Sequence, residues 1–149
     1  MKIAVEDPLT EDALKLIDGS EAALRAVYTP DECFAYSPKE LAAPNVRFYL
    51  ARDDQGAPMG CVAAADMGDY IEVKRLFVSP DAQGTGLGRA LMAHLEAEAK
   101  AAGHSMVRLE TGDLLVSACA LYERIGYVRR GPFGDYEKAE ASTFMEKAL

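Results

Sequence analysis

The chain has 149 residues, of which half are hydrophobic and 27% are charged, and its formal net charge is −8. This length and composition are typical of one folded domain, residues 1–149, with a single sizeable core. The acidic balance argues against a nucleic acid or an anionic membrane as partner, because both favour a basic face.

The sequence indicates neither a membrane segment nor a metal site. No apolar run approaches the roughly 20 residues that cross a bilayer, and the first residues lack the pattern of a secretory signal. Cys33, Cys61 and Cys119 are far apart and form no CxxC pair. We therefore expect no zinc site and no disulfide framework, and a cytoplasmic location.

Helix signals dominate the first 45 residues. After a short strand at Lys2–Val5, the apolar spacing predicts a helix within Pro8–Tyr28, with a break at Asp18-Gly19-Ser20. Ser37-Pro38-Lys39-Glu40 is a capping box with proline at the first helical position. It predicts a short helix that ends before Pro44.

Strand signals dominate the middle of the chain. Val46–Arg52 and Pro58–Ala65 flank the turn Asp53-Asp54-Gln55-Gly56, which predicts a hairpin. Ile71–Val78 alternates apolar and polar residues and follows a second turn, so it is predicted as the next strand of a meander.

Helices and strands alternate in the remainder. The expected helices are Gly86–Ala102, ended by Gly103, and Val116–Ile125, ended by Gly126; the expected strands are Ser105–Thr111, Tyr127–Arg130 and Thr143–Lys147. A meander followed by strand–helix repeats predicts an α/β (α+β) fold. Its centre would be a mixed, mostly antiparallel sheet flanked by helices.

Three alternating glycines, Gly84, Gly86 and Gly88, separate the strand ending at Val78 from the next helix. Such a turn aims backbone N–H groups at one point beside the positive end of a helix, and a missing Cβ lets a phosphate approach. Arg89 adds charge. The spacing fits neither the Walker loop nor the dinucleotide fingerprint, which disfavours a nucleotide site. Taken alone, the glycines also fit a purely structural turn.

The residues around this turn resemble a known family. Gln83-Gly84-Thr85-Gly86-Leu87-Gly88 is similar to the Q/R-x-x-G-x-G/A signature of the GCN5-related N-acetyltransferases. Some 40 residues on, Ala118-Cys-Ala-Leu121-Tyr122-Glu-Arg-Ile-Gly126-Tyr127 resembles that family's A-x-x-L-Y-x-x-x-G-F/Y signature. The specific likeness covers Ile71–Tyr127, and the rest matches in the order of its elements.

The resemblance implies a binding site for acetyl-CoA as co-substrate. The diphosphate would lie on the glycine turn, from Gln83 and Gly84 through Thr85, Gly86, Leu87 and Gly88 to Arg89. The pantetheine arm would run beside Leu76, Phe77 and Val78, whose backbone offers donors and acceptors to its amides. Family members often carry an asparagine where this chain has Leu115. That contact is absent here or supplied by Ser117.

The resemblance also implies a general acid, Tyr122, which would protonate the departing CoA thiolate. A half-buried aromatic on an amphipathic helix is the structural alternative for this residue. Two carboxylates are candidates for the base that deprotonates the acceptor ammonium, Glu110 and Glu72, and a water chain is a third possibility. His94 and His104 are interpreted as surface or packing residues.

Two functions fit these patterns. The first is an enzyme that moves an acetyl group to a primary amine of a small molecule or peptide by direct attack. The second is an acyl-CoA-binding sensor of the same fold without turnover, which the leucine at position 115 keeps open. The segment Thr10–Pro44 would line the acceptor side in this fold. Nothing in it names the acceptor, and a homodimer is possible.

Overall fold

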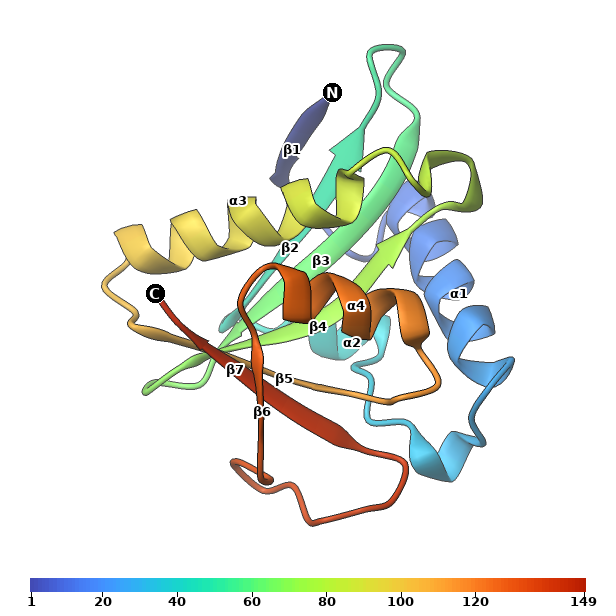
Figure 1. The fold of residues 1–149 in the computed structure, drawn as a ribbon. Coiled ribbons are helices and arrows are strands. Elements are labelled where there is room, and N and C mark those ends of the chain that lie inside the picture. The colour runs from blue at the N-terminus through green and yellow to red at the C-terminus, as the bar shows by residue number, and fades with distance from the viewer.

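Seven strands form one mixed sheet in the computed structural model, which describes residues 1–149, and helices cover both of its faces (Figure 1). The strand order is β1-β2-β3-β4-β5-β7-β6. The strands are β1 (Lys2–Val5), β2 (Val46–Arg52), β3 (Pro58–Asp66), β4 (Ile71–Val78), β5 (Met106–Thr111), β6 (Val128–Arg130) and β7 (Thr143–Ala148). The helices are α1 (Glu11–Arg25), α2 (Pro38–Leu41), α3 (Leu87–Ala101) and α4 (Val116–Arg124), with 3₁₀ turns at Pro30–Glu32 and Pro80–Ala82.

The expected fold class is confirmed. Every neighbouring pair of strands is antiparallel except β4 and β5. Alternate residues of the strands feed two apolar layers: Tyr49 and Val62 pack with α3, whereas Phe48 and Cys61 pack with α1 and α2. None of the helices combines the length and the apolarity that a membrane crossing requires.

The parallel strands β4 and β5 separate soon after they meet. They pair only at Ile71 with Val107 and at Glu72 with Arg108. From Val73 onward β4 has no partner strand on this side, and Figure 1 shows the two strands spreading apart between α1 and α4. The sheet therefore contains an open, V-shaped gap at its centre.

A β-bulge in β4 changes which way its side chains point. Lys74 pairs with Ala63 and Phe77 with Cys61, so two residues of β4, Arg75 and Leu76, face one residue of β3. Arg75 has a left-handed backbone, with φ of 53°. The extra residue keeps Lys74 and Arg75 on the α1 side and returns Leu76 to the layer of α3 and α4. Simple alternation along this strand, as the sequence suggested, holds only up to the bulge.

The expected break at Asp18-Gly19-Ser20 is wrong, because α1 runs through it without interruption. Gly19 is in the helix for a tertiary reason. A Cβ at Gly19 would lie 2.8 Å from two ring atoms of Phe77, so only glycine lets α1 pack this closely on β4. The glycine reflects contact between elements and not a local turn.

The other boundaries agree with the sequence within two residues, apart from the ends of α1. The Ser37 capping box opens α2, and Gly103 and Gly126 follow α3 and α4 with φ of 93° and 105°, as expected of left-handed helix ends. At the start of α1, Thr10 caps the helix by accepting from the Ala13 N–H at 3.3 Å, so Pro8 lies outside it.

We predict that Gly19→Ala destabilises the protein. Alanine is favoured over glycine in a helix by about 1 kcal/mol, but forcing a methyl against a packed ring typically costs about 1–3 kcal/mol. In a Phe77→Leu background the ring is gone, so the same change should become neutral or stabilising. Urea unfolding of the four proteins measures both effects. A higher midpoint for Gly19→Ala in the parent chain would contradict the packing role.

Candidate active site

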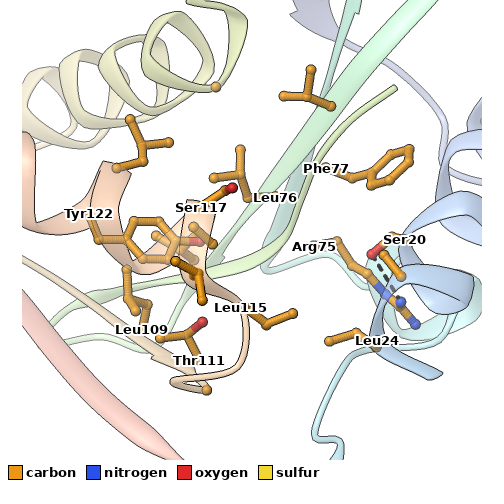
Figure 2. A pocket seen from close by; sticks show the side chains of 18 of the residues that line it. Ser20, Leu24, Arg75, Leu76, Phe77, Leu109, Thr111, Leu115, Ser117 and Tyr122 are labelled. Atoms are coloured by element: carbon orange, nitrogen blue, oxygen red, sulfur yellow. Dashed lines mark hydrogen bonds between the residues drawn. The ribbon is translucent and has the colours of Figure 1, made fainter. Parts of the chain in front are cut away.

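A cavity of about 760 Å³ fills the gap between β4 and β5. The end of β4 and the glycine turn form one wall, and the end of β5 with the first half of α4 forms another. Helix α1 and the segment after it close the remaining side, as the positions of Ser20 and Leu24 show (Figure 2). The site is thus assembled from segments distant in the sequence.

Most of the residues singled out from the sequence line this one cavity. They are Leu76, Phe77, Val78, Gln83, Gly84, Gly86, Leu87, Gly88, Arg89, Glu110, Ser117 and Tyr122. Two do not. The Thr85 hydroxyl donates to the Ala82 carbonyl at 2.5 Å within the turn, and Glu72 is buried among other side chains.

The glycine turn leaves room for a ligand against its backbone. Gly84 and Gly86 have left-handed φ of 76° and 86°, and a Cβ at either would meet nothing within 4 Å. The first N–H groups of α3 have no helical acceptors, and no turn or cap bond takes them up. Gly88 differs, because its Cβ would lie 3.1 Å from Leu121 Cδ2. That glycine lets α3 approach α4.

The tyrosine of the second motif points into the cavity (Figure 2). Tyr122 is 6% exposed and lies beside Tyr127, with ring centroids 5.8 Å apart. Its hydroxyl makes no hydrogen bond to the protein and is not completely shielded from solvent. Burial raises the pKa of the Tyr122 phenol well above its ordinary value. The group is therefore protonated at neutral pH.

Glu110 is the penultimate residue of β5, lies at the cavity wall and has a strongly shifted pKa. Burial raises the pKa of the Glu110 carboxyl to about 7; the Ser142 hydroxyl and the Lys74 ammonium act in the opposite direction, and Glu72 adds to the rise. A carboxyl with this pKa exchanges its proton near neutral pH. That property suits a general acid or base.

The other candidate carboxylate, Glu72, is held in a closed network. It is 3% exposed, its Oε2 lies 2.8 Å from Lys74 Nζ, and it accepts from the Tyr136 hydroxyl at 2.7 Å. Lys74 Nζ also lies 4.4 Å from the centre of the Tyr36 ring. Because its partners already satisfy it and it does not line the cavity, the geometry favours Glu110 over Glu72 as a base.

Several residues of the site carry no signal in the sequence. The Tyr28 hydroxyl accepts from the Leu114 N–H at 3.0 Å and so joins the segment after α1 to the loop before α4. The ring crosses Gly112, where any Cβ would overlap the phenol. Arg75 lies at the cavity wall but donates to the Tyr36 carbonyl and pairs with Glu21. These contacts join residues tens of positions apart, so no local pattern reveals them.

The histidines lie away from the cavity. The His94 ring packs edge-on against Tyr49 in the layer under α3, and His104 Nε2 is 3.3 Å from Asp66 Oδ2. No group of three or more His, Cys, Asp or Glu side chains is placed to hold a metal ion.

Comparison with known proteins identifies relatives for nearly the whole chain. The sequence model described as "Acetyltransferase (GNAT) family" matches residues 15–127. A protein of Azospirillum brasilense named IAA acetyltransferase is 42% identical over 149 residues, which cover 99% of this chain and 97% of that one.

Solved structures agree with this grouping. A Klebsiella pneumoniae protein assigned as an acyl-CoA N-acyltransferase superposes with a TM-score of 0.84 at 32% identity, covering 99% of this chain and 97% of that one. The PaiA N-acetyltransferase of Thermoplasma acidophilum, solved with coenzyme A, superposes with a TM-score of 0.74 at 17% identity over 100% of both chains. At that identity the second likeness concerns the fold.

We predict that Glu110→Gln changes how stability depends on pH. The pKa of Glu110 is about 7 in the folded protein and 4.5 ordinarily, so the unfolded chain releases this proton at a lower pH than the folded protein does. Glu110 therefore stabilises the folded state at low pH relative to high pH. That contribution is lost as the pH rises from 4.5 to 7, by at most about 3 kcal/mol. Glutamine cannot titrate.

Urea unfolding of both proteins at pH 4.5 and pH 8 measures this difference. The free energy of unfolding of Glu110→Gln, relative to that of the parent, should increase from pH 4.5 to pH 8. A stability difference that is the same at both would show that Glu110 ionises normally in the folded protein.

Proposed function

Because the chain belongs to the acetyltransferase (GNAT) family, we propose that it transfers the acetyl group of acetyl-CoA to a primary amine of a small molecule or peptide. The observation that carries this proposal is the meeting of three groups in one cavity. These are the open glycine turn, the unpartnered Tyr122 hydroxyl and the Glu110 carboxyl with its pKa of about 7.

The cavity wall fits the chemistry of acetyl-CoA. The space at Gly84 and Gly86 and the free N–H groups of α3 suit a diphosphate, and Arg89 adds a cation. The unpaired edge of β4 at Leu76 and Val78 suits the amides of the pantetheine arm. When bound, acetyl-CoA supplies an activated thioester, whose acetyl group passes to the amine nitrogen as the thiol leaves.

In this proposal Glu110 prepares the acceptor. Its carboxylate accepts a proton from the acceptor ammonium, either directly or through one water, and leaves a neutral amine that attacks the acetyl carbonyl. A base with a pKa near 7 is matched to this task at neutral pH, since it is partly ionised and still binds a proton well. Glu72 would act on the reaction only through its network with Lys74.

Tyr122 completes the transfer by giving its phenolic proton to the departing sulfur, and the proton that the attacking nitrogen loses as the amide forms returns to the Tyr122 oxygen directly or through one water. Burial raises the pKa of the phenol, which by itself makes it a weaker acid. The same apolar surroundings disfavour a thiolate beside it, so they raise the proton affinity of the sulfur as well. The proton transfer therefore stays favourable in the enclosed site.

Gly86→Asp tests the glycine turn. The substitution adds a negative charge where the diphosphate is proposed to lie, and we expect CoA affinity to fall on the order of a hundredfold. Gly56→Asp is the matched control: Gly56 has φ of 85°, its Cβ would also meet nothing within 4 Å, and it lies outside the cavity. Calorimetry measures both. Equal affinity in the two folded variants would remove the turn from the binding site.

Tyr122→Phe tests the acid. It keeps the ring and removes only the hydroxyl, so stability and the KM for acetyl-CoA should change little, while turnover should fall about 100-fold. Tyr70→Phe is the control, since Tyr70 is a buried tyrosine outside the cavity whose hydroxyl makes no hydrogen bond to the protein. Steady-state kinetics and thermal melting are the measurements, with the acceptor found by a thiol-release screen of primary amines.

Unchanged turnover in Tyr122→Phe would assign the proton to water or to the acceptor. If the parent protein binds CoA tightly but releases no thiol with any amine, the protein acts as an acyl-CoA sensor and the proposed transfer is wrong.

A further inference from the structure

The α1 side of the cavity differs in character from the side that faces the glycine turn. Its surface comes from Leu24 on α1, from Tyr28 and Phe34 in the segment that follows, and from Leu114 before α4. Phe34 and Leu114 are 45% and 59% exposed, unusual values for large apolar side chains. An apolar wall thus continues to the mouth of the cavity and remains open to solvent.

The cations on this side are already paired. Arg75 donates to the Tyr36 carbonyl at 3.0 Å and lies 2.7 Å from a Glu21 oxygen. Lys74 Nζ lies 2.8 Å from Glu72 Oε2 and 2.7 Å from the Tyr136 hydroxyl. The remaining cations of the lining, Arg89 and Arg124, belong to α3 and α4. An anionic group of an acceptor would therefore find no free cation beside α1.

The carboxylates are equally few. Glu32 and Glu110 are the acidic residues of the lining. Glu32 is exposed to solvent, and its Oε1 accepts within its own turn from the Thr29 N–H at 2.9 Å and from the Thr29 hydroxyl at 3.0 Å. Glu110 faces the cavity. Glu110 is thus the partly buried carboxyl of the lining, and a second ammonium held inside the cavity would lie against apolar side chains.

We infer that the acceptor is a primary amine carried on an apolar or aromatic body without a second charge. This inference rests on the proposed acetyl transfer and narrows its acceptor. The single amine would reach Glu110, and the apolar body would pack on Leu24, Tyr28, Phe34 and Leu114. A carboxylate or a second ammonium packed against this apolar wall would lose part of its hydration without gaining a partner.

Two matched pairs of amines test the inference on the unaltered protein by thiol release. Phenethylamine and phenylalanine differ by a carboxylate, and hexylamine and 1,6-diaminohexane differ by a second amine. We expect kcat/KM to be about 100-fold higher for phenethylamine than for phenylalanine, and about tenfold higher for hexylamine than for the diamine. Equal or reversed preferences in either pair overturn the inference and leave the acetyl transfer intact.

A negative charge placed on the apolar wall should reverse the preference for hexylamine over 1,6-diaminohexane. Leu24→Glu adds a carboxylate on α1, so kcat/KM for hexylamine should fall about tenfold and that for 1,6-diaminohexane should rise. Leu9→Glu makes the same change at a leucine that is 50% exposed and outside the cavity, and both values should stay as in the parent.

The controls separate the possible failures. Thermal melting and CoA calorimetry verify that each variant folds and binds CoA; if Leu24→Glu does not fold, the amine pairs decide alone. A folded Leu24→Glu with the parent's preference would show that the acceptor does not lie on α1. If no amine of the screen causes thiol release, the proposed function itself is contradicted. If only amines with a second charge are turned over well, this inference alone is contradicted.

Discussion

The separation of β4 from β5 is the constraint on which the rest of the site depends. Two parallel strands that paired along their whole length would close the centre of the sheet. Here the pairing stops after Glu72 and Arg108, and the edge of β4 beyond it has no partner strand. An unpaired strand edge can normally pair with a strand of another chain. Here α1 and α4 lie on either side of the edge and leave room only for a slender ligand.

The bulge in β4 determines how charge is distributed around that opening. It places Lys74 and Arg75 in succession on the α1 face, where two unpaired buried cations would be costly. Each has its own partner, Glu72 for Lys74 and Glu21 for Arg75. Glu110 is then left without a dedicated cation, and this explains why burial dominates its pKa. Burial therefore sets the pKa of Glu110, whereas Glu72 and Glu21 are held in ion pairs.

Local patterns in the sequence predicted most of the fold. Periodicity, capping residues and turn residues placed every strand and helix, because these signals act within a few positions. Gly19 was misinterpreted because its role is set by the Phe77 ring, which lies 58 positions away and leaves no local trace. The bulge at Arg75 was missed for a similar reason, since two strands together define it.

The candidate site was predictable where local sequence motifs form it and not where tertiary contacts do. The glycine turn and Tyr122 lie in motifs that specify their surroundings. Glu72 and Glu110 looked alike in the sequence, since each is a carboxylate in a strand. What separates them is Tyr136, 64 positions from Glu72, together with Lys74. The Tyr28 contact with Leu114 spans 86 positions and was equally hidden.

The strand order also has a consequence for how the site forms during synthesis. Strand β7 lies between β5 and β6, and β6 has no other partner. The segment between these last strands supplies Tyr136 to Glu72 and Ser142 to the surroundings of Glu110. A nascent chain can pair its meander and form the glycine turn before β7 leaves the ribosome, but its two carboxylates then lack their final neighbours. The surroundings of Glu72 and Glu110 are therefore complete only after the segment between β6 and β7 has packed on the sheet.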